Sequence, residues 1–205
     1  MRQPLGVSEA MLWPETIRSV VKTGPDREVV AVYPYRSACP TSTWAQLISG
    51  AQQELFFGGF TNYFLWLQQS AFHATLREKA AGGCRVRFLV GNPDSGITRQ
   101  REQVEDVALT VSTRIRITLE ELAKLTDTSG IETRFTHPAD AVNHVSLSVF
   151  RFDHDALVTP HLARSAGHDS PMMHLRRGQE QGMFDRFAEH AEELWERGST
   201  VEPQG

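Results

Sequence analysis

Cys84-Arg-Val-Arg-Phe-Leu-Val90, followed by Gly91-Asn-Pro-Asp-Ser95, is the stretch of sequence that decides the fold class. Charged and apolar side chains alternate along its first half, as they do in a strand whose two faces meet different surroundings. Arg85 and Arg87 share one face, and apolar side chains take the other. The stretch therefore predicts a strand that ends in a tight turn.

Similar segments occur on both sides of this strand. We expect further strands at residues 29–33, 54–57, 131–135, 145–152, 156–160 and 172–176. Apolar residues at helical spacing predict helices at residues 41–51, 64–81, 100–125 and 183–197. This order predicts an α/β fold, a mostly parallel mixed β-sheet flanked by helices on both faces.

Composition excludes several classes of protein. The length of 205 residues suits one α/β domain, and the net charge of −4 argues against a broadly basic, nucleic-acid-coating surface. Cys39 and Cys84 lack metal-ligand spacing and suit reduced cytosolic thiols. The chain shows no signal peptide and no apolar run long enough to span a bilayer. No zinc-protease or nucleotide-binding motif occurs. We expect a cytoplasmic protein with no membrane partner, metal or cofactor.

The predicted strand at residues 145–152 carries a degenerate motif. Val145-Ser-Leu-Ser-Val-Phe-Arg-Phe-Asp153 resembles the catalytic strand of phospholipase D enzymes, whose signature is His-x-Lys-x4-Asp. Aligning Asp153 with the motif Asp puts Ser146 at the His position and Ser148 at the Lys position. The register that begins at His144 fails too, because Ser146 then replaces the Lys and Arg151 the Asp. Serine can neither form the phosphohistidine nor neutralise phosphoryl charge, so we expect no catalytic residue and no enzyme.

A longer resemblance is carried by Asn92-Pro-Asp-Ser95, Phe150-Arg-Phe-Asp153 and Pro171-Met-Met-His-Leu-Arg-Arg177, in this order. Together they resemble the phospholipase-D-like C-terminal domain of bacterial, chiefly actinobacterial, helix-turn-helix transcriptional regulators. The resemblance implies a phospholipase-D-like fold over residues 29–198. We expect residues 1–28 to be the remnant of a linker after a missing DNA-binding domain, and residues 199–205 to be a disordered tail. DNA would be contacted only through a helix-turn-helix domain absent from this chain.

Ligands of open α/β sheets bind beyond the carboxyl ends of the strands. The candidate ligand-binding residues lie at expected strand ends or at the vestigial catalytic positions: Arg87, Asn92, Asp94, Ser146, Ser148, Asp153, His161, His174 and Arg176. We expect them to converge on one crevice that takes a neutral or weakly anionic small molecule as readily as a phosphate. The plain alternatives are that Arg87 is a solvated or paired surface charge, and that Arg176 pairs with an acidic residue such as Asp153.

Three functions remain open on the sequence alone. The first is a non-catalytic domain for ligand sensing or dimerisation in transcriptional regulation, with a small-molecule effector and a homodimer as partners. The second is a divergent phosphodiesterase or nuclease with His144 or His161 as nucleophile. The third is a purely structural dimerisation module without a ligand.

Overall fold

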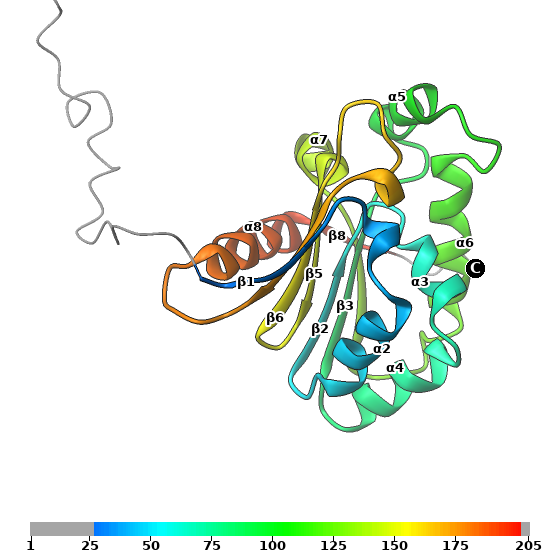
Figure 1. Cartoon of the computed structure of the whole chain (residues 1–205). Helices are drawn as coiled ribbons and strands as arrows, with labels where there is room; N and C mark the ends of the chain where they lie inside the picture. Colours follow the sequence, from blue (N-terminus) through cyan, green and yellow to red (C-terminus); the bar gives the residue numbers. More distant parts are fainter. Residues whose placement is uncertain (1–26, 202–205) are drawn as a thin grey trace, which may run out of the picture.

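The computed structural model describes residues 27–201, so most of the expected linker, residues 1–26, lies outside the described part, as do residues 202–205. An eight-stranded sheet forms the centre of the described part, in the order β1-β7-β6-β5-β2-β3-β4-β8 (Figure 1). Its strands are β1 (Val29–Tyr33), β2 (Glu54–Gly58), β3 (Arg85–Val90), β4 (Ile131–Phe135), β5 (Leu147–Phe152), β6 (Asp155–Pro160), β7 (Met172–Arg176) and β8 (Ser199–Thr200).

The predicted α/β class with a mixed sheet is confirmed, but parallel pairing is less extensive than expected. Only β2–β3 and β3–β4 are parallel neighbours among the described strands, and the other five neighbouring pairs are antiparallel. The reason lies in the connections. Helices link β2 to β3 and β3 to β4, whereas Asp153 and His154 alone join β5 to β6, which forces an antiparallel hairpin.

Helices cover both faces of the sheet, as expected (Figure 1). One face carries α2 (Thr41–Gly50), α3 (Tyr63–Gln68), α4 (Phe72–Ala81) and α6 (Val111–Ala123), and the other carries α8 (Met183–Arg197). Strand alternation divides the core between them. Leu55 and Phe57 of β2 pack with the first group, whereas Phe56 packs with α8.

Five further helical segments are described in addition to these helices. They are η2 (Arg36–Ala38), α5 (Gly96–Glu105), η3 (Pro138–Asp140), α7 (Ala141–Ser146) and η4 (Gly167–Asp169). Of these, α5 and α7 lie at one end of the sheet (Figure 1). Within the described part of the chain, every helix is too short or too polar to cross a membrane.

Two expected helices are each divided in the structure. The helix predicted at residues 64–81 is split into α3 and α4, because Ala71 adopts a left-handed conformation with a φ of 55°. The helix predicted at residues 100–125 ends at Asp106, with a φ of 43°. It restarts as α6, where the Thr110 hydroxyl accepts from the Thr113 backbone N–H. Single left-handed residues other than glycine leave little trace in sequence patterns.

Two further boundaries differ from the expectation. Val145 and Ser146 belong to α7 rather than to a strand, and Ser146 is exposed, with its hydroxyl donating to the Val142 carbonyl at 2.6 Å. The expected disordered tail begins with β8, whose Ser199 and Thr200 pair with the free edge of β4. Unpaired backbone groups at a sheet edge favour such pairing.

Glu28 lies one residue before β1 and is held by the opposite end of the chain's described part. Its side chain is buried and accepts hydrogen bonds from the backbone N–H groups of Gly178 at 2.8 Å, Gln179 at 3.1 Å and Phe184 at 2.7 Å. This carboxylate therefore anchors the residue before β1 to the start of α8, where negative charge is favoured by the helix dipole.

Candidate ligand-binding pocket

The nine candidate residues do not share one crevice, so that expectation is wrong. Because β5 runs antiparallel to β2, Ser148 lies at the carboxyl end of β2, whereas Asp153 lies at its amino end. His161 follows β6 at the same end as Ser148. Arg176 is opposite Asp155, at the same end as Asp153. The length of the strands separates the two groups.

A cavity of about 40 Å³ lies at the carboxyl end of β2. It is lined by the turn after β2, by η2, α5, α6 and β5, and by the loop between β6 and β7. Five of its side chains matter most for its chemistry, and we call the site the arginine pocket after them: Arg36, Arg101, Arg114, Ser148 and His161. The position agrees with the general rule for ligands of α/β sheets.

His161 and Ser148 form a hydrogen-bonded pair in this pocket, with 2.9 Å between Nε2 and Oγ. Burial, followed by the positive charges of Arg101 and Arg36, lowers the pKa of His161 to about 4, against a smaller opposing effect of Glu105. The imidazole is therefore neutral at neutral pH. A Cβ on Gly167 would lie 2.8 Å from Cε1 of His161, so the loop passes directly against the ring.

Two of the three arginines share one carboxylate. Arg101 Nε donates to Glu105 Oε1 at 2.9 Å, and Arg114 Nη2 donates to Glu105 Oε2. Arg101 Nη2 also donates to the carbonyl of Ser165 at 2.5 Å, which ties the loop between β6 and β7 to α5. Both oxygens of Glu105 are thereby occupied.

Arg36 is the exception among these arginines. Its guanidinium lies 3.8 Å from the centroid of the Phe64 ring, which is a close cation–π contact. Among residues 27–201, no side chain or carbonyl accepts a hydrogen bond from it. Burial, followed by the charge of Arg114, lowers the pKa of Arg36 to about 10, while Glu105 opposes this shift. The pocket therefore holds a partly buried cation that has no counter-ion of its own among residues 27–201.

Asn62 forms the floor of the pocket and was missed by sequence reasoning. Its Nδ2 donates to the carbonyls of Phe57 at 3.0 Å and Leu89 at 3.2 Å, and so joins the ends of β2 and β3. A Cβ on Gly59 would lie 2.4 Å from Asn62 Oδ1, which explains the glycine there. Gly58-Gly59 followed by Asn62 was the available signal, since a glycine turn with an Asn in left-handed geometry often ends a strand.

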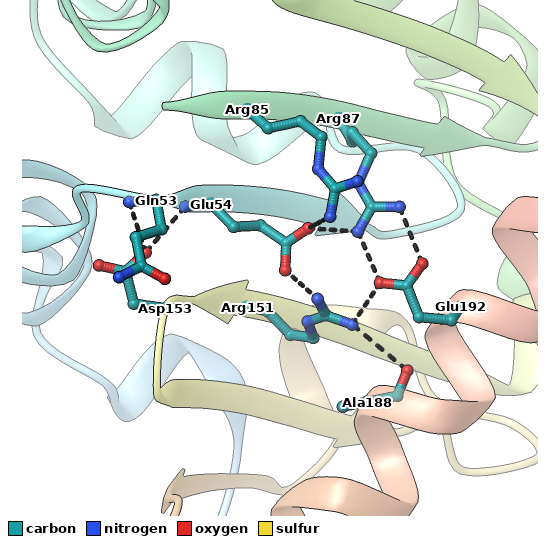
Figure 2. A network of polar contacts seen from close by, with 8 residues as sticks. All are labelled: Gln53, Glu54, Arg85, Arg87, Arg151, Asp153, Ala188 and Glu192. Carbon is teal, nitrogen blue, oxygen red and sulfur yellow. Dashed lines mark hydrogen bonds and ion pairs between the residues drawn. The ribbon is translucent and has the colours of Figure 1, made fainter. Parts of the chain in front are cut away.

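Arg87 lies on the α8 face, in a network with Glu54, Arg151 and Glu192 that we call the balanced ion cluster (Figure 2). Arg87 binds Glu192 through Nη1 at 2.9 Å and Nη2 at 2.6 Å, and also binds Glu54. Arg151 binds Glu54 and Glu192, the latter at 2.8 Å. The paired-charge alternative thus describes Arg87, although only 1% of its side chain is exposed.

The electrostatics of the balanced ion cluster follow from mutual pairing. Burial alone would raise the pKa of Glu192, but the hydrogen bonds and charges of Arg87 and Arg151 outweigh it and lower the pKa to about 2. Arg87 also lies 5.1 Å from the Phe56 ring centroid and 5.0 Å from that of Trp195. The cluster fixes α8 to the sheet.

Asn92 and Asp94 lie beyond β3, at the same end as the arginine pocket, but serve the turn itself. Asn92 Oδ1 accepts from the Asp94 backbone N–H at 2.8 Å. The exposed Asp94 carboxylate binds Arg116 at 2.6 Å. Neither side chain lines the arginine pocket.

The opposite end of the sheet holds Asp153, His174 and Arg176. Asp153 accepts from the backbone N–H groups of residues 52–54 at 2.7 to 2.9 Å and closes the turn before β2. His174 and Arg176 both bind Asp155, at 2.6 and 3.0 Å, so Arg176 pairs with an acid as the alternative expected, though not with Asp153. These residues border a groove of about 420 Å³ in which each candidate charge has a partner.

Comparisons with known proteins identify the family of the chain. It belongs to the family described as "Domain of unknown function (DUF5919)", whose model matches residues 27–202. A comparison with curated proteins gave no match.

Solved structures with similar folds include the following two. TrmBL2, described as an archaeal chromatin protein with a novel mode of DNA binding, has a TM-score of 0.52 and 14% identity, over 94% of this chain and 59% of TrmBL2. Nuc, a phospholipase D family member from Salmonella typhimurium, has a TM-score of 0.44 and 12% identity, over 78% of this chain and 90% of Nuc. At 14% identity the likeness to TrmBL2 concerns the fold and not the function.

Proposed function

We propose that residues 27–201 form a non-catalytic, phospholipase-D-like sensor domain that serves a cytoplasmic transcriptional regulator. The observation that carries this proposal is the arginine pocket, where the Ser148–His161 pair faces a cavity beside a cation without a counter-ion. The sequence resemblance to regulator domains supports the biological setting. DNA binding and homodimerisation would then belong to the whole regulator, and this chain spans only 59% of the DNA-binding protein TrmBL2.

Catalysis is the weaker alternative for physical reasons. A general base works best with a pKa near the working pH, and the pKa of His161 is lowered to about 4, first by burial. Glu105 is the only carboxylate among the described lining residues, and its oxygens are held by Arg101 and Arg114, so it cannot orient His161. Ser148 therefore lacks an activating base.

His144 is equally unsuited to act as a nucleophile. It is fully buried, hydrogen-bonded through Nδ1 to Thr136, and burial lowers its pKa to about 3. It packs edge-on against Phe60, with 5.4 Å between the ring centroids. No substrate phosphorus could approach such a ring without opening the core.

A hydrolysis assay tests the absence of catalysis. We expect the purified domain not to turn over bis-(p-nitrophenyl) phosphate above the rate of its His161→Ala variant prepared in parallel. A rate that disappears in His161→Ala but persists in His174→Ala, at the far end of the sheet, would establish an enzyme and sink the proposal.

Ligand sensing is tested by thermal unfolding with a panel of small anionic and neutral metabolites. A ligand that binds only the native state raises the melting temperature with its concentration. We expect His161→Leu to remove this rise and Arg176→Ala, at the other end of the sheet, to keep it. If no compound raises the melting temperature, the purely structural dimerisation module becomes the better account.

A DNA-binding assay tests whether this domain itself recognises DNA. Since the net charge of the chain is −4, we expect no site-selective complex with duplex DNA in a fluorescence anisotropy titration at physiological salt. A nanomolar, sequence-selective complex would show that the domain itself reads DNA.

A further inference from the structure

We propose that the arginine pocket binds a terminal phosphate group, free or as a phosphomonoester, and that Arg36 gains its counter-ion from this ligand. The inference rests on the sensor function proposed above and names the chemical class of its ligand. None of Arg36, Arg101 and Arg114 was a candidate at the level of sequence, because they come from η2, α5 and α6.

The charge of the pocket argues for a dianion. Three guanidinium groups face it, and Glu105 supplies the one carboxylate among the described lining residues. The two histidines of the lining, His161 and His168, do not change this balance while they are neutral. The excess of two positive charges matches a phosphate group that has lost two protons. Arginine is also the side chain best suited to bind phosphate through two parallel hydrogen bonds.

Arg36 argues for a ligand most directly. Arg36 is partly buried, and a guanidinium that loses part of its hydration without gaining a protein acceptor favours an anion beside it. Arg36 has the Phe64 ring against its face and the charge of Arg114 nearby, but no acceptor among residues 27–201. A ring face satisfies none of the guanidinium N–H groups, which point outward in the plane. A phosphate oxygen would supply the missing acceptor and relieve the repulsion from Arg114.

The size of the cavity limits the ligand to a small group. A volume of about 40 Å³ corresponds to about three water molecules. That space suits a phosphate group and is too small for a complete nucleotide. The exposed His168 lies at the rim, so the ester chain of a monoester could leave towards solvent there.

Ser148 and His161 complete the set of donors. The Ser148 hydroxyl can donate to a phosphate oxygen while its own oxygen accepts from Nε2 of His161, at the observed 2.9 Å. The loop that carries His161 is already tied to the arginines, since the Arg36 backbone N–H donates to the Ser170 carbonyl at 2.7 Å and Arg101 donates to Ser165. A bound phosphate would therefore hold η2, α5 and this loop together, and this ordering would be the structural output of the sensor.

Isothermal titration calorimetry at constant ionic strength and neutral pH tests the ligand class. The probes are inorganic phosphate, glycerol 3-phosphate, dimethyl phosphate, acetate and glycerol. We expect inorganic phosphate, glycerol 3-phosphate or both to bind, dimethyl phosphate and acetate to bind at least about tenfold more weakly, and glycerol not to bind. The ratio between the first two probes tells whether free phosphate or a monoester is preferred.

Variants assign the site. We expect Arg36→Met to weaken phosphate binding at least about tenfold, the loss typical of a hydrogen bond to a charged group. The phosphate affinity of Arg36→Lys should lie between those of the parent and Arg36→Met, because lysine keeps the charge but lacks the planar guanidinium. Arg99→Met, on the exposed side of α5, should bind as the parent does. Circular dichroism spectra and melting temperatures of the variants establish that each is folded.

The outcomes separate this inference from the sensor function on which it rests. Binding of glycerol or acetate as strong as that of phosphate, or phosphate binding unchanged in a folded Arg36→Met protein, would overturn the phosphate assignment. A ligand found in the wider metabolite panel would still leave the sensor function standing in that case. No binding by any probe or metabolite would remove both.

Discussion

The balanced ion cluster and the arginine pocket are built from the same residue types and differ in how their charges are matched. In the cluster, two buried arginines, Arg87 and Arg151, share two carboxylates, Glu54 and Glu192, at the interface between the sheet and α8, and the exposed Arg85 adds a contact to Glu54. In the pocket, Arg101 and Arg114 share Glu105, and the third arginine, Arg36, has no counter-ion among residues 27–201.

The difference teaches how to tell a structural group of charges from a binding site. Charge that leaves water must be compensated, and a buried pair broken by loss of one partner is strongly destabilising. Where side chains of opposite charge from the same chain pair with every buried charge, the charges hold secondary-structure elements together. Where the chain leaves a positive excess beside a cavity, the compensation is expected from a ligand.

The largest expected effect comes from breaking the balance of the cluster. Arg87→Met would leave Arg151 as the one buried arginine beside Glu54 and Glu192, and should lower the free energy of unfolding by about 3–5 kcal/mol. Urea denaturation monitored by circular dichroism measures this.

The matched control is Arg85→Met, two residues away on the same face. Arg85 also binds Glu54 but its side chain is 56% exposed, so we expect a loss below about 1 kcal/mol. Equal losses in the two variants would contradict this account of the cluster.

The pH dependence of stability should also report on the cluster. The pKa of Glu192 is about 2 in the folded protein and 4.5 without its partners, so the folded state holds fewer protons in this range. The stabilisation is complete above about pH 4.5 and is lost as the pH falls towards 2. We expect the free energy of unfolding of Glu192→Gln to fall by about 1–2 kcal/mol less than that of the parent over this pH range. This figure allows for the screening of a partly exposed group.

Glu189→Gln, on the same helix and more exposed, is the control for this prediction. If Glu189→Gln reduces the pH dependence of the free energy of unfolding as much as Glu192→Gln does, this dependence comes from general surface charge.

His161 should report on the arginine pocket through its own titration. Burial and the charges of Arg101 and Arg36 lower its pKa to about 4, so its contribution to stability is complete above about pH 6.5 and is lost as the pH falls towards 4. In NMR spectra that resolve the imidazole resonances, we expect a midpoint near 4 without phosphate and a higher one with it, because the bound anion offsets the arginine charges. A midpoint near 6.5 that phosphate does not move would show that His161 is exposed and outside any anion site.

The smallest expected effect is at Ser148. Ser148→Ala removes the hydrogen bond to His161 and should cost about 0.5–1.5 kcal/mol in urea denaturation. Ser146→Ala, on the exposed side of α7, should stay within about 0.5 kcal/mol of the parent. The reverse order would put Ser146, rather than Ser148, at the pocket.

Much of the fold could be predicted from the sequence, because alternation and helical periodicity are local signals. The bounds of β1, β4, β7 and α8 agree with the expectation to the residue. The divided helices could not be predicted, since their breaks depend on left-handed backbone at Ala71 and Asp106. The short turn at Asp153 and His154 did hold usable information. It makes β5 and β6 a hairpin, which places Asp153 and His161 at opposite ends of the sheet.

The candidate site was predictable only in part. Ser148 was named from the degenerate phospholipase D strand and His161 as a residue just past a strand end, and the structure brings them together. The arginines of the pocket were not, because Arg36, Arg101 and Arg114 are far apart in sequence and each follows an ordinary polar pattern. Only the packing of η2, α5 and α6 shows that three arginines line one cavity that contains a single carboxylate.

The most direct test of the contrast between the two charge groups is the free energy of unfolding of the parent, Arg36→Met and Arg87→Met, each with and without phosphate at constant ionic strength. We predict that Arg36→Met is as stable as the parent or more stable without phosphate, and that it loses the stabilisation that phosphate gives the parent. Arg87→Met should be strongly destabilised and should keep that stabilisation. If Arg36→Met is destabilised as much as Arg87→Met while phosphate stabilises both equally, Arg36 is a structural charge and the distinction fails.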